Sequence, residues 1–195
     1  MEEQNPKTEE KVPMTKEEKS RAFRADMYDW MQCIVSALLT CVLAFVFVGR
    51  VIGVIGSSME PTLYWGDKLV ISNLFYTPEQ GDIVVLRKEN FKSDPIVKRV
   101  IALGGQTVDI DFEKGIVYVD GVALEEDYIK EWMYVPSYGD VINNVTVPEG
   151  CIFVMGDNRN ESADSRYPAI GIVDERCVIG RAVMVLFPFG NFGVL

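Results

Sequence analysis

The sequence predicts a mainly β protein: a single N-terminal transmembrane helix followed by an antiparallel or mixed β-sheet domain. One long uncharged run lies near the N-terminus, at Trp30–Gly49. From Lys68 onward, short runs of branched apolar residues alternate with glycine and proline turns. This part lacks the regular amphipathic helices that connect parallel strands, and 195 residues suit one domain plus an anchor.

The uncharged run Trp30–Gly49 has the length of a membrane span. Its helix would reach roughly 30 Å at about 1.5 Å per residue, which matches the hydrocarbon core of a bilayer. A buried core helix is the alternative, but the run has no polar face for a soluble protein to expose. We expect residues 30–49 to cross the lipid bilayer, with Tyr28 and Trp30 at one interface.

The flanks of this run predict its orientation. Residues 1–29 form a charged tail that is too long for a cleaved signal peptide, and we expect it to be partly disordered and helical near the membrane. Only Arg50 follows the run closely, whereas several basic residues precede it: Lys16, Lys19, Arg21 and Arg24. Because basic residues favour the cytoplasmic side, we expect a plasma-membrane protein with its N-terminus inside and residues 50–195 outside.

Turn signals divide residues 50–195 into short strands. We expect strands at Lys68–Ser72, Asp82–Leu86, Ile96–Leu103, Thr107–Asp111, Ile116–Val119, Cys151–Met155 and Val178–Leu186. Asp120-Gly121 is typical of a hairpin turn. The final residues 187–195 are apolar but are broken by proline and glycine, so they are too short for a second span.

Composition excludes several function classes. A net charge of −10 argues against nucleic-acid binding, which needs clustered lysine and arginine. The chain has no histidine, which excludes a Ser-His-Asp or Cys-His centre and a histidine-ligated zinc within it. We expect no metal and no cofactor. A catalytic serine here would need a lysine as its base.

Four cysteines are present, without CxxC or zinc-site spacing. Cys33 and Cys41 lie in the apolar run. Cys151 and Cys177 lie in strand-like runs and could pair outside the cell, but we favour two free, buried thiols.

The segment Ile55–Leu63 presents two adjacent serines after a glycine. Gly56 permits backbone angles that other residues avoid, and Pro61 fixes φ, so a tight turn can hold the Ser58 hydroxyl toward a substrate. On its own, such a Gly-Ser-Ser sequence is also a common loop.

Lys98 is the candidate base. In a strand, Ile96, Lys98 and Val100 point to one face, so the amine lies among apolar neighbours. Burial disfavours the ammonium and lowers the pKa of a lysine, which is otherwise near 10.4 and leaves almost no neutral amine at pH 7. The alternative is a surface lysine that buries only its stem.

Ile55–Leu63, Ile96–Ile101 and Gly156–Arg166 together resemble, in order and spacing, the motifs of bacterial type I signal peptidases of the Gram-positive kind. These are membrane-bound serine proteases that use a Ser–Lys pair. Gly81–Val85 and Ile179–Ala182 extend the resemblance, which runs from about Arg50 to the C-terminus. It implies a signal peptidase fold, with Ser58 as nucleophile and Lys98 as general base.

The resemblance also implies supporting residues. Ser162 corresponds to the serine that hydrogen-bonds the catalytic lysine, Asp164 and Arg166 to a structural ion pair, and Arg99 to a supporting residue beside the lysine. A tetrahedral intermediate needs oxyanion donors, and the backbone N–H of Ser58 is one candidate.

The second oxyanion donor stays open, because Gly56 stands where many Gram-negative members carry a serine. The substrate pocket is expected to have walls beside the serine and lysine, at Val54, Ile55, Met59, Leu63 and Val97. Residues 112–150 correspond to a variable, non-catalytic part of the family. Within them, the acidic and aromatic stretch 122–147 is expected to be a solvated surface.

The implied function is cleavage of N-terminal signal peptides from exported preproteins after small residues, at sites of the Ala-X-Ala type. The expected partners are these preproteins, the lipid bilayer and the secretion translocon, with no nucleic acid. A specialised Ser–Lys peptidase and a catalytically silent binding domain of the export machinery are the alternatives. Ser58 lies nine residues after Gly49, a reach of about 30 Å at most, so the site is expected near the outer membrane surface.

Overall fold

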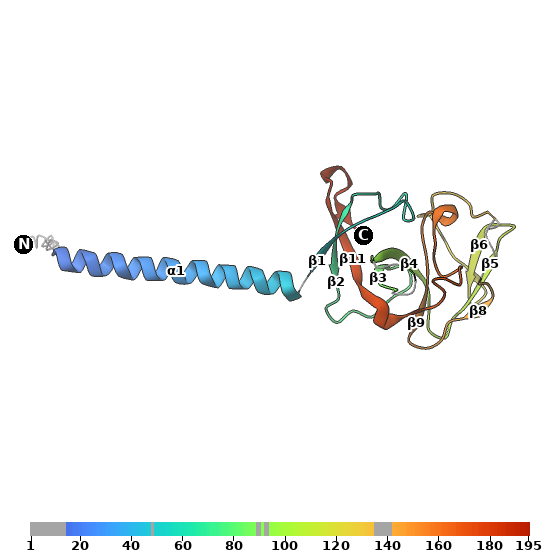
Figure 1. The fold of residues 1–195 in the computed structure, drawn as a ribbon, viewed down its shortest axis with the longest axis horizontal. Helices are drawn as coiled ribbons and strands as arrows, with labels where there is room; N and C mark the ends of the chain where they lie inside the picture. The colour runs from blue at the N-terminus through green and yellow to red at the C-terminus, as the bar shows by residue number, and fades with distance from the viewer. Residues whose placement is uncertain (1–14, 48, 89–90, 92–93, 135–141) are drawn as a thin grey trace, which may run out of the picture. The chain divides into compact units, whose positions relative to one another are not determined.

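The structure is a computed structural model that describes residues 15–47, 49–88, 91, 94–134 and 142–195. It divides into two compact units, Met1–Ala44 and Phe45–Leu195, which we describe separately. Figure 1 shows the single long helix of the first unit and the strands of the second.

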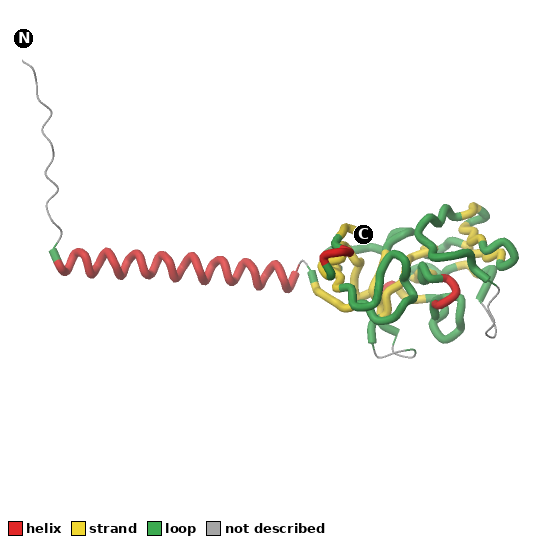
Figure 2. Tube along the Cα trace, turned by 90° about the horizontal axis from the view of Figure 1, so that it is seen from above, coloured by secondary structure: helices red, strands yellow, loops and turns green. Residues whose placement is uncertain are grey.

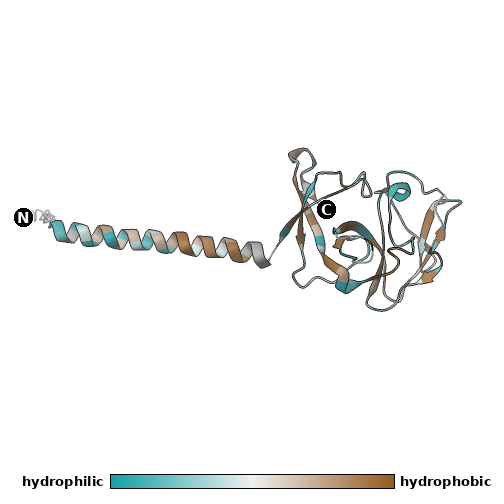
Figure 3. Ribbon diagram, in the orientation of Figure 1, coloured by the Kyte–Doolittle hydropathy of each residue, from teal (hydrophilic) through white to brown (hydrophobic). Residues whose placement is uncertain are grey.

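Helix α1 spans Lys16–Phe47 and changes from hydrophilic in its first turns to hydrophobic further along (Figure 3). Among the described residues, no helix combines the length and the apolar character that crossing a bilayer requires. The predicted span at residues 30–49 is therefore not confirmed. Its residues 44–48 lie outside the described side chains, and residues 1–14 of the predicted tail lie outside the described chain.

The larger sheet of the second unit has the strand order β1-β2-β11-β3-β4-β9-β10, with β12 paired to β11. All of its pairs are antiparallel. Its strands are β1 Arg50–Gly53, β2 Lys68–Ser72, β3 Ile83–Leu86, β4 Ile96–Leu103, β9 Cys151–Met155, β10 Val173–Asp174, β11 Val178–Phe187 and β12 Gly193–Val194. The mainly β, antiparallel prediction is confirmed for this unit, with β3 beginning one residue later and β11 ending one residue later than expected.

The smaller sheet has the order β7-β6-β5-β8 and is also antiparallel. Its strands are β5 Thr107–Asp111, β6 Ile116–Val119, β7 Val122–Ala123 and β8 Val145–Thr146. The predicted hairpin turn joins β6 to β7. Asp120 and Gly121 have φ of 52° and 78°, as a type I′ turn requires at both central positions.

After α1, helical structure in the described part of residues 49–195 is limited to short 3-10 turns (Figure 2). They are η1 Arg159–Glu161, η2 Glu175–Cys177 and η3 Phe189–Asn191. β3 is buried at every position because the sheet is covered on both faces there. One core cluster joins Leu69 of β2, Val97 of β4 and Val185 of β11 to Val54 and Met59, and so supports the segment that carries Ser58.

All four cysteines are free. The expectation that Cys151 and Cys177 are free is confirmed, but both are half-buried and not buried. Partial burial raises the pKa of the Cys151 thiol, which therefore carries the neutral form at pH 7.

Candidate active site

The candidate nucleophile lies on the loop between β1 and β2. Gly56 has φ of 96°, and the N–H of Glu60 donates to the Ser57 carbonyl at 3.1 Å, which closes a turn around Ser58. Asn158 holds the turn from outside: its N–H donates to the Ser58 carbonyl at 3.1 Å and its Nδ2 to the Ser57 carbonyl at 3.0 Å. These hydrogen bonds hold the backbone at Ser58. None of them involves the Ser58 hydroxyl.

Lys98 comes from the middle of β4, opposite Val84 of β3. The residue is 3% exposed, which contradicts the alternative of a surface lysine. Its Nζ lies 2.7 Å from Ser58 Oγ and 2.9 Å from the Val97 carbonyl. A buried amine in hydrogen-bond contact with a serine hydroxyl is the arrangement that a Ser–Lys pair needs.

The Gly156–Arg166 segment is built on a buried ion pair. Arg166 donates from Nε to Asp164 Oδ1 and from Nη2 to Oδ2, both at 2.8 Å, and both side chains are shielded from solvent. Burial alone would raise the pKa of Asp164, but the charge and hydrogen bonds of Arg166, with a hydrogen bond from the Gly156 N–H and the nearby Ser162 hydroxyl, hold that pKa below its usual value. The carboxylate is therefore ionised at neutral pH.

Ser162 is buried beside this pair. Its Oγ makes no hydrogen bond of full geometric quality among the described residues, although it lies close enough to Asp164 to help lower that pKa. A Cβ at Gly156 would lie 2.3 Å from Ser162 Oγ and 2.4 Å from the Ser58 carbonyl. Gly156 thus allows Ser162 and the nucleophile's backbone to approach each other. The Ser162–Lys98 hydrogen bond stays a prediction.

Arg99 connects β4 to Asp157 of the Gly156–Arg166 segment and to Gly81, which precedes β3. Its Nε and Nη2 donate to the two Asp157 oxygens at 2.8 and 2.6 Å, and its Nη1 donates to the Gly81 carbonyl at 2.9 Å. The Thr62 hydroxyl, from the nucleophile's loop, donates to the same Asp157 carboxylate. Arg99 accordingly occupies a supporting position beside the lysine.

The acidic and aromatic stretch 122–147 fits the expectation of a solvated surface only in part. Glu125, Asp127, Glu131 and Trp132 are exposed, but Glu126–Tyr134 also packs along the Gly156–Arg166 segment. The Glu126 side chain is 6% exposed and pairs with the fully buried guanidinium of Arg159. Met133 is buried, and Arg166 Nη1 lies 3.2 Å from its sulfur. The burial of Glu126 is hard to predict from the sequence, because a carboxylate inside an acidic stretch usually faces water.

At Gly56, the position of the open second oxyanion donor, the backbone and not the space selects glycine. A Cβ there would meet no atom within 4 Å, but φ of 96° disfavours any side chain. The identity of that donor stays a prediction.

A cavity of about 260 Å³ adjoins the Ser58–Lys98 pair. Four of the five predicted pocket residues line it, namely Val54, Ile55, Met59 and Val97. Leu63 is not among the lining residues; it is fully buried in the core cluster beneath the loop. The sequence reasoning missed other lining residues, which adjacency to the motifs did not single out: Phe91, Pro95, Ile96, Glu161 and Ala163.

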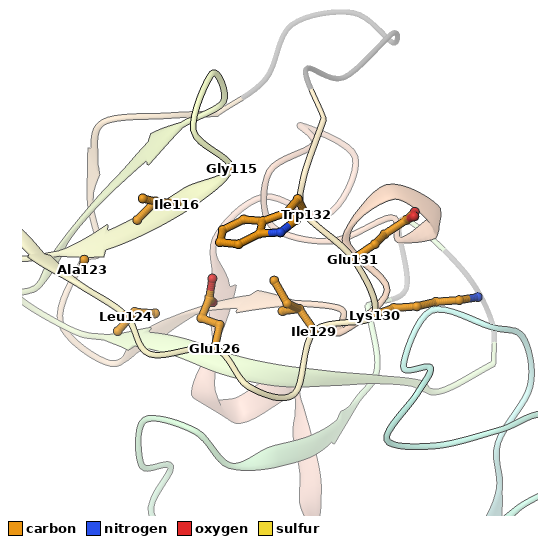
Figure 4. Close-up of a pocket in the computed structure, with 9 residues that line it drawn as sticks. All are labelled: Gly115, Ile116, Ala123, Leu124, Glu126, Ile129, Lys130, Glu131 and Trp132. Carbon is orange, nitrogen blue, oxygen red and sulfur yellow. The ribbon is translucent and has the colours of Figure 1, made fainter.

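A second cavity of about 610 Å³ lies between the β6–β7 hairpin and the stretch that follows it (Figure 4). Ile116, Leu124, Ile129 and Trp132 give it apolar walls, and Glu126 points toward it from below in this view. Among the described residues, no group of three or more histidine, cysteine, aspartate or glutamate side chains could hold a metal ion.

Comparison with known proteins places this geometry in context. The profile of the family described as signal peptidase, peptidase S26, matches residues 27–187. A probable signal peptidase I-1 from Synechocystis sp. is 39% identical over 169 residues, which cover 82% of each chain. A signal peptidase I from Bacillus licheniformis is 36% identical over 184 residues, covering 90% of this chain and 96% of the other. A crystal structure of a signal peptidase I from Enterococcus faecalis V583 aligns with a TM-score of 0.43 and 31% identity, over 57% of this chain and 98% of that one.

Proposed function

Because the chain belongs to the signal peptidase family, peptidase S26, we propose that it removes N-terminal signal peptides from exported preproteins as a membrane-anchored serine endopeptidase. Ser58 is the nucleophile and neutral Lys98 the general base. The observation that carries this proposal is the 2.7 Å contact between Ser58 Oγ and the buried Lys98 Nζ.

The reaction follows from this contact. Neutral Lys98 takes the proton of the Ser58 hydroxyl as Oγ attacks the scissile carbonyl carbon. We assign the Ser58 N–H the role of a donor to the oxyanion of the tetrahedral intermediate. The resulting ammonium then protonates the leaving amine, and the signal peptide stays as an ester on Ser58. Lys98 next activates a water that hydrolyses this ester.

The supporting residues serve to aim the amine. Asp164 and Arg166 form a rigid, buried mount, and Ser162 stands on that mount with a buried hydroxyl next to the Ser58 backbone. We assign Ser162 the role of orienting Lys98 Nζ toward Ser58. Arg99 fixes the strand immediately after the base through Asp157.

We assign substrate specificity to the cavity beside the pair. Val54, Met59 and Val97 give it apolar walls, which suit the apolar side chains of an Ala-X-Ala sequence. The substrate would lie extended along neighbouring strand edges, as bound peptides commonly do.

The membrane placement rests on sequence and surface. The uncharged run at residues 30–49, the hydropathy change along α1 and the basic residues before the run support an anchor with a cytoplasmic N-terminus (Figure 3). At the β1–β2–β11–β12 end of the second unit, several large apolar side chains are exposed, including Trp65, Phe75 and Phe189. This surface suits contact with lipid, and it would bring the site to preproteins emerging from the secretion translocon.

The test uses the purified full chain in detergent with a preprotein that carries an Ala-X-Ala site. We expect cleavage after the second alanine and none by Ser58→Ala. Equal cleavage by the wild type and Ser58→Ala would rule out the proposal that Ser58 is the nucleophile of this endopeptidase. Absence of cleavage by both proteins would favour a catalytically silent binding domain. Cleavage of only one preprotein among many would favour a specialised peptidase.

A further inference from the structure

Three alternate residues of the stretch Glu126–Tyr134 touch the supports of the candidate active site. We propose that Glu126, Tyr128 and Lys130, here called the clamp, position the Ser58–Lys98 pair for the reaction. This proposal rests on the proposed function and adds to it a part of the chain that carries no chemistry of its own.

Tyr128 restrains the residue that follows the base. Arg99 Cζ lies 4.0 Å from the centroid of the Tyr128 ring, within the range of a cation–π contact. The edge of the same guanidinium is bound by the Asp157 carboxylate and the Gly81 carbonyl. With its face stacked and its edge bonded, the guanidinium has one orientation, and this fixes β4 next to Lys98.

Glu126 restrains the loop opposite. Arg159 donates from Nη1 to Glu126 Oε2 at 2.9 Å and from Nη2 to Oε1, and its Nε donates to the Gly156 carbonyl at 3.2 Å. The Tyr128 hydroxyl donates to Glu126 Oε1 at 3.1 Å, which joins the first two clamp residues. Because the Arg159 side chain is fully buried, it depends on this carboxylate to balance its charge.

Lys130 connects the same stretch to the nucleophile's loop. Its backbone N–H donates to the Asp157 carbonyl at 3.1 Å, and its Nζ pairs with Glu60 Oε2 at 2.8 Å. Glu60 lies two residues after Ser58. The clamp therefore reaches both segments that meet at the active site, from a stretch of chain whose course Figure 4 shows at Glu126 and Lys130.

The clamp acts through other residues and not on the substrate. None of its three members is among the residues that line the cavity beside Ser58 and Lys98 in the described part of the chain. They are thus positioning residues. Loosening them should displace the Ser58–Lys98 contact while leaving the substrate cavity in place, so kcat should fall and KM should stay nearly constant.

The experiment compares variants of the full chain in detergent with a peptide carrying an Ala-X-Ala site. Rates are expressed per folded protein, from thermal melting followed by circular dichroism. Tyr128→Leu and Glu126→Gln should each lower kcat by about 10- to 100-fold, because displacing the reacting groups by up to about an ångström has a cost of that size. KM should change less than about threefold. Tyr128→Phe keeps the ring on Arg99 and should recover most of kcat.

Two exposed residues of the same region provide matched controls, Glu125→Gln and Tyr134→Leu, and both should keep the wild-type kcat. Unchanged kcat in folded Tyr128→Leu and Glu126→Gln would overturn the proposal, as would equal losses in the controls or a rise in KM alone. If Tyr128→Leu does not fold, Glu126→Gln decides. An inactive wild type would overturn the proposed function and the clamp with it, whereas an active wild type with unaffected variants overturns the clamp alone.

Discussion

Lys98 sits in the middle of a strand with its amine removed from water and next to a hydroxyl. Ile96, Val97 and Val100 near it on β4 are branched and apolar, and Val84 lies opposite on β3. Burial removes water from the amine and so disfavours its charged form. In the proposed mechanism, Lys98 takes the part that histidine has in other serine proteases.

Replacing this lysine by arginine separates charge from basicity. Lys98→Arg keeps a long cationic side chain, but a guanidinium does not lose its proton at working pH. We expect cleavage to fall by at least about 10²- to 10⁴-fold, the contribution of a general base. Steady-state cleavage of the Ala-X-Ala peptide measures the loss. Activity within threefold of the wild type would show that position 98 does not act by accepting a proton.

The buried pair Asp164–Arg166 has an exposed counterpart of the same spacing, Asp174–Arg176. Asp164→Asn leaves a buried guanidinium without its counterion and should cost about 3–5 kcal/mol in the free energy of unfolding. Asp174→Asn, on the surface, should cost clearly less. Denaturant unfolding of both variants provides the comparison. Equal losses would mean that burial does not set the value of the pair.

Acid has a defined effect on the same carboxylate. Because the pKa of Asp164 is lowered in the folded protein, its contribution to stability is present above the unfolded pKa, near 3.9, and is lost as the pH falls through the folded value. Unfolding measured between pH 7 and pH 2 should show this loss in the wild type. A wild-type profile in that range identical to that of Asp164→Asn would contradict it.

Single residues also mark the limit of sequence reasoning. Ser58 and Lys98 lie in motifs that can be recognised from the sequence alone. The fold then brings their side chains into contact. Leu63 was assigned to the pocket because it is close to the serine in sequence, yet a turn directs it into the core. Glu126 and Arg159 are 33 residues apart, and only the folded chain shows that they neutralise each other.

At the scale of elements, the Gly156–Arg166 segment controls how closely the loops meet. Gly156→Ala would place a methyl carbon 2.3 Å from Ser162 Oγ and 2.4 Å from the Ser58 carbonyl, so one loop must move. We expect a loss in kcat of about 100-fold, since a shift of an ångström in the reacting groups has that cost. At Gly190 a Cβ would meet no atom, and Gly190→Ala should leave kcat unchanged. Similar rates for both variants would show that the close approach is unimportant.

The strands divide in the same way into those that a pattern reveals and those that pairing creates. Lys68–Ser72 and Thr107–Asp111 alternate or run as branched residues between turn signals, and both were predicted at their observed bounds. β8, β10 and β12 have two residues each, too few to show a period. β1 directly follows the apolar run, and its strand character comes from pairing with β2.

For the whole molecule, the proposed anchor makes a prediction of its own. The full chain should stay in the membrane fraction after alkaline carbonate washing. The double variant Leu38→Arg, Leu39→Arg places two charges in the middle of the proposed span. Each adds about 2.5–3.5 kcal/mol to the free energy of insertion, so most of the protein should be released from the membrane fraction. Ser20→Arg, outside the run, is the control. A wild type released by carbonate, or a double variant retained like the control, would contradict the anchor.

The account as a whole depends on a neutral, buried amine that activates Ser58, and the pH dependence of kcat/KM tests it most directly. The wild type in detergent should gain activity with rising pH through one ionisation that lies below the pKa of an exposed lysine, about 10.4. Ser58→Ala, treated identically, fixes the background rate. A kcat/KM that stays flat from mildly acidic to alkaline pH would contradict the central role of Lys98.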